Sequence, residues 1–419
     1  MKYNKSKTVY LWCVLITTMV ACSKIDDYRS KYMSDGAIVY TGKIDSLSIF
    51  SGKNRVEISG LLSSDPNIVK YRVFFNGRQD SSEVSVTRTS GVDTVSHIID
   101  GLDEGQMSFE IRTYDAAGHS SVPIFASASV FGDFYQSSLI NRGIEDAGMQ
   151  DDGSALITWA DINADAGILN MEIKYQDSNS VAHDTLIPSV TSGQTTVLPQ
   201  YKLGSALEYQ TAYLPTPTSI DTFYTAFQRH TVKADVTKLY LSNYGPGFAR
   251  ETFDGRWGTL AAPWITNAAA KNKDGGINGG YTSDSRWGIS GQINWETWGN
   301  TPVTDGKIYQ PTAIPLPAGN YTVQFRYYSE IQSNSSVYCI AAAGNGIPSM
   351  DGLSGALGYT LLYNGANVGG TSPNLEEVRS FSFTLTSPQT VSIGFLGNLV
   401  GNGNPGNYFV LNYVQLIQN

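Results

Sequence analysis

The chain has 419 residues, of which 41% are hydrophobic, and this is enough apolar sequence for two or three domains with cores of their own. Its 42 glycines and 25 tyrosines, against only 28 lysines and arginines, favour short strands and turns over helices, so we expect an all-β protein. A formal net charge of −9 excludes nucleic-acid binding through bulk electrostatics, because the phosphate backbone requires a basic surface.

Residues 1–21 are typical of a signal peptide. Three lysines in the first seven residues precede a mainly apolar stretch that is shorter than the roughly 20 residues of a permanent membrane helix. The stretch ends in "MVAC", which resembles a bacterial lipobox, and this resemblance implies that Cys22 carries lipid and becomes the first residue of the mature chain. Loss of the three lysines lowers the formal net charge from −9 to −12.

Residues 22–35 form a predicted tether. The sequence "SKIDD" directly after Cys22 resembles the surface-export signal of Bacteroidota-type outer-membrane lipoproteins, although a solvated charged tether is an alternative interpretation. The resemblance implies lipid anchoring in the outer membrane, exposure at the cell surface and, as a further partner, a neighbouring glycan-uptake complex.

Two segments, about 55 to 125 and 155 to 225, align at an offset close to 100 residues. "VKYRVFFNG" lies over "LNMEIKYQD", and the paired apolar residues, from Val69 over Leu169 to Phe75 over Tyr175, share one face of a strand. About a hundred residues of short alternating strands predict an immunoglobulin-like sandwich in each copy. We place the first module at 36–132, a polar linker at 133–152 and the second module at 153–235.

The second copy resembles a fibronectin type III domain. "SALITWADI" is similar to that family's second strand with its buried Trp159, and "LGSALEY" has a leucine six residues before Tyr209, as in the family's tyrosine corner. Gly60 stands in the first copy where Trp159 would align, so other residues must fill that core. The two copies together also resemble a paired module of unassigned function in Bacteroidota-type lipoproteins, which implies an architecture and no catalytic residue.

The third predicted domain spans 236–419. "LPAGNYTV", residues 316 to 323, is a turn that leads into an alternating strand, and it resembles a step common in galactose-binding-like sandwiches, the jelly-roll fold of many carbohydrate-binding modules. The expected architecture is therefore two tandem immunoglobulin or fibronectin III-like sandwiches followed by a galactose-binding-like jelly roll.

Five of the six tryptophans expected in the mature chain lie between residues 257 and 298. If "INWETW" is a strand, Trp295 points inward while Asn294, Glu296 and Trp298 share the opposite face. An exposed indole beside an amide and a carboxylate suits a sugar, because its face can contact C–H groups while the polar groups bind hydroxyls. The predicted carbohydrate site comprises Trp257, Trp264, Asn278, Tyr281, Asp284, Trp287, Asn294, Glu296 and Trp298. Core packing and a protein-contact patch are alternative explanations of these tryptophans.

Other chemistries have weaker support in the sequence. Asp274 and Asn278 in "KNKDGGINGG" could supply oxygen ligands to a structural calcium ion, but the segment lacks the acidic density of a dedicated calcium loop, so no cofactor is expected. Asp254, Asp284 and Glu296 could serve a glycoside hydrolase or lyase if two carboxylates converged. The four histidines form no metal or triad motif. We therefore expect no enzyme activity.

The interpretation from the sequence is a non-catalytic cell-surface lipoprotein. Its C-terminal sandwich binds a polysaccharide or other glycan, as in accessory proteins of polysaccharide utilisation, and its N-terminal modules act as a spacer. One alternative is a structural or adhesion lipoprotein with a protein partner. The second alternative is a glycosidase or lyase.

The anchor can be tested by the substitution Cys22→Ala. Without the thiol no lipid can be attached, so we expect the protein to move from the membrane pellet to the soluble fraction when cells are fractionated. If Cys22→Ala still sediments with the membranes, another attachment holds the chain there.

Overall fold

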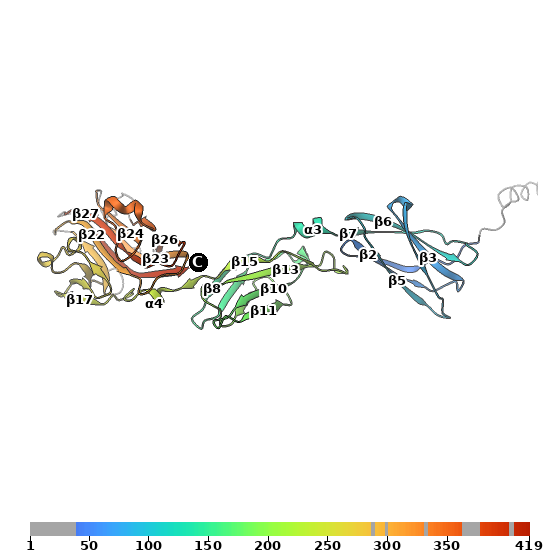
Figure 1. Cartoon of the computed structure of the whole chain (residues 1–419), viewed down its shortest axis with the longest axis horizontal. Coiled ribbons are helices and arrows are strands. Elements are labelled where there is room, and N and C mark those ends of the chain that lie inside the picture. The colour runs from blue at the N-terminus through green and yellow to red at the C-terminus, as the bar shows by residue number, and fades with distance from the viewer. Residues whose placement is uncertain (1–38, 286–289, 298–300, 331–333, 363–377, 402–405) are drawn as a thin grey trace, which may run out of the picture. The chain divides into compact units, whose positions relative to one another are not determined.

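A computed structural model of the chain describes residues 39–285, 290–297, 301–330, 334–362, 378–401 and 406–419. The fold is all-β, as the composition predicts (Figure 1). The described residues divide into two compact units: one contains residues 39–140, 164–169 and 211–225, and the other contains the described residues of 141–163, 170–210 and 226–419. Among the described residues, no helix has both the length and the apolarity to cross a membrane.

The first unit is built around a sandwich of seven strands. One sheet has the order β1-β2-β5 and the other β4-β3-β6-β7. The strands are β1 (Asp45–Ser51), β2 (Arg55–Leu62), β3 (Ile68–Phe75), β4 (Asp80–Ser85), β5 (Asp93–Asp100), β6 (Gly105–Asp115) and β7 (Ile124–Val130), with a 3-10 turn, η1, at Asn76–Arg78. Side chains from both sheets, among them Val56, Val73 and Phe109, are fully buried in one core.

Gly60 explains how this core does without a tryptophan. A side chain at that position would approach the Cγ2 atom of Ile44 to 2.4 Å, and Ile44 is itself 2% exposed. Ile44 therefore fills the space. The prediction that Val69 shares a strand face with Phe75 is wrong, because the β3–β6 register shifts between Ile68 and Lys70, so that Ile68 is buried and Val69 is exposed.

The second sandwich begins inside the segment that we expected to be a linker. Residues 133–152 contain a short helix, α3 (Asp133–Ser138), and a strand, β8 (Ile144–Met149), which pairs with β9 (Ala155–Trp159). The linker prediction is wrong for residues 144–149, because "IEDAGM" does not alternate regularly between apolar and polar residues and its pairing partner lies outside the segment.

Two sheets form this second sandwich. One has the order β12-β9-β8, and the other has the order β11-β10-β13-β14, with β15 also on β13. Its remaining elements are β10 (Ile168–Gln176), β11 (Ala182–Ile187), β12 (Thr195–Leu198), β13 (Ala206–Tyr213), β14 (Phe223–Tyr224), β15 (Gln228–Thr231) and the turn η2 (Ala164–Ala166). Trp159 is 1% exposed, meets Tyr209 edge to face at 5.4 Å between ring centroids and donates from Nε1 to Thr196 Oγ1 at 2.9 Å. The prediction of a buried Trp159 is confirmed.

The expected tyrosine corner has a different geometry. The Tyr209 hydroxyl donates to the backbone oxygen of Arg142 at 3.0 Å, so it joins β13 to the start of the sandwich. Leu203, the leucine six residues earlier, is 39% exposed and lies outside the core.

The C-terminal domain is a sandwich of an eight-stranded and a five-stranded sheet. The larger has the order β17-β18-β20-β21-β28-β23-β26 with β16 also on β28, and the smaller has the order β19-β22-β27-β24-β25. The strands are β16 (Ala234–Asp235), β17 (Arg250–Phe253), β18 (Trp257–Leu260), β19 (Ile265–Thr266), β20 (Gly280–Thr282), β21 (Gln292–Glu296), β22 (Val303–Pro311), β23 (Gly319–Glu330), β24 (Ser336–Ala343), β25 (Gly358–Leu361), β26 (Val378–Leu385), β27 (Val391–Leu399) and β28 (Tyr408–Gln418). Short helical turns are α4 (Thr237–Tyr240), η3 (Ala268–Ala270), η4 (Asp274–Gly276) and η5 (Met350–Gly355).

An apolar core lies between these two sheets. Phe325, Phe395 and Phe409 are fully buried in it, together with Trp295. Cys339 is also fully buried, and burial raises the pKa of its thiol well above the ordinary value. Strand β16 pairs with the last residues of β28, so residues 234 and 235, which we had assigned to the second module, belong to the C-terminal sheet.

Candidate functional site

The predicted tryptophan platform is only partly within the described residues. Trp287 and Trp298 lie outside them. Trp264 is 5% exposed, its Nε1 donates to the backbone oxygen of Asn243 at 2.7 Å, and its ring stacks against Phe395 in the core. The prediction that Trp264 contacts a ligand is therefore wrong, because its polar atom and its ring faces serve the fold.

Strand β21 is buried on both of its faces. Trp295 is 0% exposed and packs against Phe409, as the alternation predicts. Asn294 on the opposite face is 1% exposed, and its Nδ2 donates to the backbone oxygen of Phe409 at 3.0 Å. The prediction that Asn294 is open to a sugar is therefore wrong. The alternation of side chains along β21 predicted which strand face Asn294 occupies. It did not predict that other parts of the domain bury that face.

Glu296, the last residue of β21, is the centre of a polar cluster. Its Oε2 lies 2.8 Å from Nη2 of Arg256, and the same nitrogen lies 3.5 Å from Oδ2 of Asp284. The side chains of Glu296 and Asp284 are 10% and 13% exposed, whereas that of Arg256 is 39% exposed. Two predicted site residues are thus brought together by a guanidinium that reaches the surface. We call Arg256, Trp257, Lys273, Asp284 and Glu296 the Arg256 cluster.

The β17–β18 hairpin positions Arg256 and Trp257. Asp254 Oδ1 accepts the backbone N–H groups of Arg256 and Trp257 at 2.8 and 2.7 Å, which fixes the turn between the strands. Trp257 is half-buried, with the Arg256 guanidinium 4.6 Å and the Lys273 ammonium 4.5 Å from its ring centroid. Both cations are attracted by the indole face. Part of the ring that we predicted to stack on a sugar is therefore already covered.

A second turn brings Asn272 and Lys273 to the same strand end. Lys273 Nζ donates to the backbone oxygen of Glu296 at 2.8 Å, and Asn272 Nδ2 donates to that oxygen at 3.0 Å. Lys273 is 3% exposed, and its burial lowers the pKa of the ammonium group to about 8. The positive charge of Lys273 is costly here, because water cannot reach it.

Tyr281, Asn278 and Asp274 have structural partners. Tyr281 is 2% exposed, and its hydroxyl accepts from Arg250 Nη1 at 3.3 Å. Asn278 Nδ2 donates to Asp274 Oδ2 at 2.6 Å, so the two calcium candidates bind each other. Within the described ranges, no group of three or more His, Cys, Asp or Glu residues could hold a metal ion.

Sequence reasoning missed the two cations of the cluster. Arg256 follows a turn in "FDGRWG", and Lys273 lies in the glycine-rich "KNKDGGINGG", a segment whose only predicted role is to supply oxygen ligands to calcium. A useful signal was available, since two cations near a tryptophan in an acidic chain need carboxylate partners, and Asp284 and Glu296 are nearby in the sequence.

Two family models match different parts of the chain. Residues 22–223 match the DUF4998 family model, described as a domain of unknown function, and residues 242–394 match DUF5013, described likewise. A comparison with curated proteins gave no match.

Solved structures with some likeness to the chain include the FN1–FN3 domains of chicken CNTN1, at 12% identity over 46% of this chain and 68% of that one, with a TM-score of 0.26. The K3 cleaved adhesin domain of Lys-gingipain from Porphyromonas gingivalis W83 has 14% identity over 41% of this chain and 98% of its own, with a TM-score of 0.23. The K1 adhesin domain of the same protein has 17% identity over 40% of this chain and 96% of its own, with a TM-score of 0.25. We draw no function from these scores.

The buried Lys273 predicts a specific pH dependence of stability. The unfolded chain holds this proton more tightly than the folded chain, so the free energy of unfolding should rise between about pH 8 and the ordinary lysine pKa of 10.5. The full gain is on the order of 3 kcal/mol. Urea unfolding at pH 7.5 and 9.5, in wild type and in Lys273→Met, measures it. Wild type should gain stability relative to the variant, and equal changes in the two proteins would show that Lys273 is not the titrating group.

Proposed function

We propose that this protein binds carbohydrate without catalysis and that the Arg256 cluster is part of the binding site. The observation that carries the proposal is the convergence of the half-exposed Arg256 guanidinium with the carboxylates of Asp284 and Glu296 beside Trp257. Within a domain whose interior is apolar, this group places donors, acceptors and an aromatic ring at one position near the surface.

The chemistry of the cluster suits sugar hydroxyl groups. A hydroxyl both donates and accepts, so it can bind a guanidinium N–H and a carboxylate oxygen at the same time. Arg256 and Asp284 offer that combination, and the remaining open part of Trp257 offers an apolar surface for C–H groups. The contacts of Asp254 and Glu296 hold these groups in place before a ligand arrives, which reduces the entropy lost on binding.

The same geometry argues against glycoside hydrolysis. A glycosidase needs its two carboxyl groups on opposite sides of the scissile bond, with the sugar between them. Here one nitrogen of Arg256 contacts both Asp284 and Glu296, so both carboxylates are already paired with a cation of the protein itself. We therefore propose a binding role for these carboxylates.

The cellular context that we propose follows from the N-terminal sequence. The signal peptide, the lipobox-like "MVAC" and the short tether favour a lipoprotein anchored in the outer membrane through Cys22, with its sandwich domains outside the cell. A polysaccharide or other glycan would be its ligand, and a glycan-uptake complex could lie beside it. Many copies on one surface would raise a weak affinity per site by avidity.

Exposed aromatic residues in the first unit favour a second candidate function, adhesion to a protein partner. Phe125 on β7 is 71% exposed and Phe134 in α3 is 80% exposed. Large apolar side chains of this kind are enriched in protein interfaces. In this alternative the Arg256 cluster serves only the stability of the C-terminal sandwich.

Affinity electrophoresis tests the proposal. The full chain is run through gels that contain a panel of plant, host and microbial glycans, and wild type is compared with Arg256→Gln. We expect one class of glycan to retard wild type and the variant to lose about tenfold in affinity, because one charge-assisted hydrogen bond to the ligand is lost. Arg250→Gln, in the same hairpin, is the matched control and should be retarded like wild type.

A second variant and a folding measurement distinguish the loss of a ligand contact from the loss of folding. Asp284→Asn leaves the Arg256–Glu296 pair intact and should also weaken retardation, and thermal unfolding of each variant confirms that it is folded. If a glycan retards wild type and both variants equally, the cluster is not the site. If no glycan retards wild type, the adhesion alternative is favoured.

A further inference from the structure

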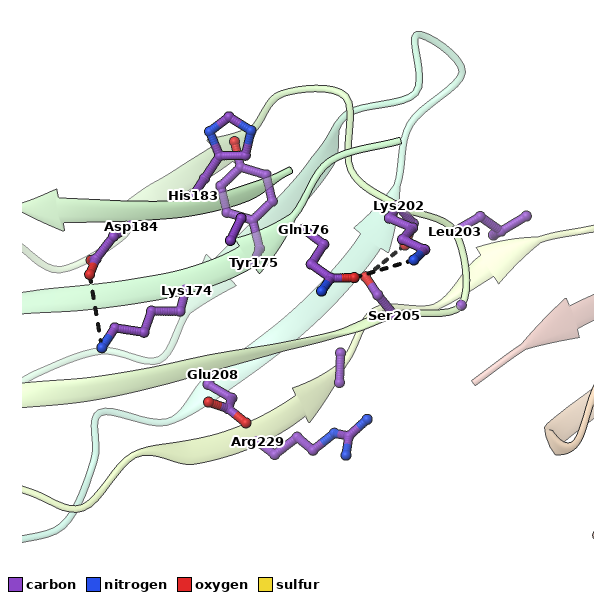
Figure 2. Close-up of a pocket in the computed structure, with 13 residues that line it drawn as sticks. Lys174, Tyr175, Gln176, His183, Asp184, Lys202, Leu203, Ser205, Glu208 and Arg229 are labelled. Atoms are coloured by element: carbon purple, nitrogen blue, oxygen red, sulfur yellow. Dashed lines mark hydrogen bonds and ion pairs between the residues drawn. The ribbon is translucent and has the colours of Figure 1, made fainter. Parts of the chain in front are cut away.

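The second sandwich, which we had interpreted as a spacer, has an open groove of about 670 Å³ on its larger sheet. Strands β10, β11, β13 and β15 form its floor, and the turn of residues 202–205 forms its rim (Figure 2). A volume of this size accommodates a small ligand or a few sugar units. Every residue that lines it belongs to the second compact unit.

The strand registers place charged side chains side by side on the outer face of this sheet. Lys174 on β10 is opposite Asp184 on β11, and Glu208 on β13 is opposite Arg229 on β15. Figure 2 shows these four side chains on the groove side of their strands, with Lys202 and Ser205 at the rim. The floor therefore alternates positive and negative groups.

The positive charges of the groove are only partly neutralised. Lys174 lies 3.1 Å from Glu172 and 3.9 Å from Asp184. Lys202 Nζ donates to two neutral oxygens, Gln176 Oε1 at 3.3 Å and Ser180 Oγ at 3.1 Å. Among the described residues, no carboxylate lies within 4.0 Å of the Arg229 guanidinium, which is exposed to solvent. The groove thus presents two cations that lack anionic partners, in a chain whose net charge is −9.

The rim of the groove is held in a fixed shape. Tyr201 donates from its hydroxyl to the backbone oxygen of Ser205 at 3.0 Å, and Ser205 Oγ donates to the backbone oxygen of Lys202 at 2.7 Å. Gly204 has a φ angle of +75°, and a Cβ atom there would lie 3.2 Å from Nε2 of Gln418 in the C-terminal sheet. The positive φ angle favours glycine at this position. Leu203 is exposed at this rim and adds a small apolar surface.

From these contacts we propose that the groove binds the carboxylate-bearing sugar units of an acidic polysaccharide, with Arg229 and Lys202 as the residues that bind the carboxylate. A guanidinium or ammonium group without an anionic partner attracts a carboxylate, and an acidic sugar unit carries one such group. Asp184 and Glu208 can accept hydrogen bonds from the neighbouring sugar hydroxyls. This site is separate from the Arg256 cluster and does not depend on it.

The proposal is tested by measuring the binding of the full chain to polygalacturonate with titration calorimetry at low salt. A neutral galactan of similar length is the comparison ligand for the carboxylate, and polyglutamate is the comparison ligand for an acidic polypeptide. We expect polygalacturonate alone to bind, with affinity that falls as the salt concentration is raised. Arg229→Gln and Lys202→Gln should each weaken binding by about tenfold, because each removes one charge-assisted contact.

Lys238→Gln is the matched control, since it also removes one exposed positive charge but lies in α4, outside the groove. It should bind polygalacturonate like wild type. The proposal is overturned if polygalacturonate does not bind, if Arg229→Gln and Lys202→Gln bind it as well as wild type, or if polyglutamate binds equally. Arg256→Gln separates this proposal from the preceding one, because it should leave binding in the groove unchanged.

Discussion

Glu296 holds together the part of the C-terminal sandwich on which this account of function depends. Its carboxylate binds Arg256 from the β17–β18 hairpin, and its backbone oxygen accepts from Lys273 and Asn272 of the following turn. Its own strand is fixed by pairing with β28 and by Trp295 in the core. A buried carboxylate without such partners would be costly, so the three segments stabilise one another.

The Arg256 cluster contains closely spaced charged groups, and one of them is accessible to solvent. Arg256 and Lys273 both lie within cation–π range of Trp257, yet only Arg256 reaches the surface. Each such contact contributes from about 0.5 to 2 kcal/mol, according to how far the pair is removed from water. The groove of the second sandwich differs, because its charges lie on an exposed sheet face and its unpaired cations are available to a ligand. Two domains thus offer two kinds of polar surface.

The sequence predicted what depends on local pattern. The all-β class, the buried Trp159 and the inward Trp295 follow from composition and from the alternation of strands. Burial of Asn294 and Trp264 could not be predicted, because it depends on partners far away in the sequence, Phe409 and Asn243. The charged groove has no local motif at all, since its residues come from four strands whose registers bring them together. Strand β8 was missed for a different reason, because "IEDAGM" does not alternate regularly between apolar and polar residues.

The most direct measurement of the central claim is the NMR signal of the Trp257 indole in the full chain. Trp257 Nε1 is buried without a hydrogen-bond partner in the described structure, so its resonance should respond to a ligand at the adjacent Arg256. With ¹⁵N-labelled tryptophan and assignment by Trp257→Phe, we expect a retarding glycan to shift this resonance. The indole signal of Trp159, in the core of the second sandwich, should stay in place. An unchanged Trp257 signal at saturating glycan would contradict a carbohydrate site at the Arg256 cluster.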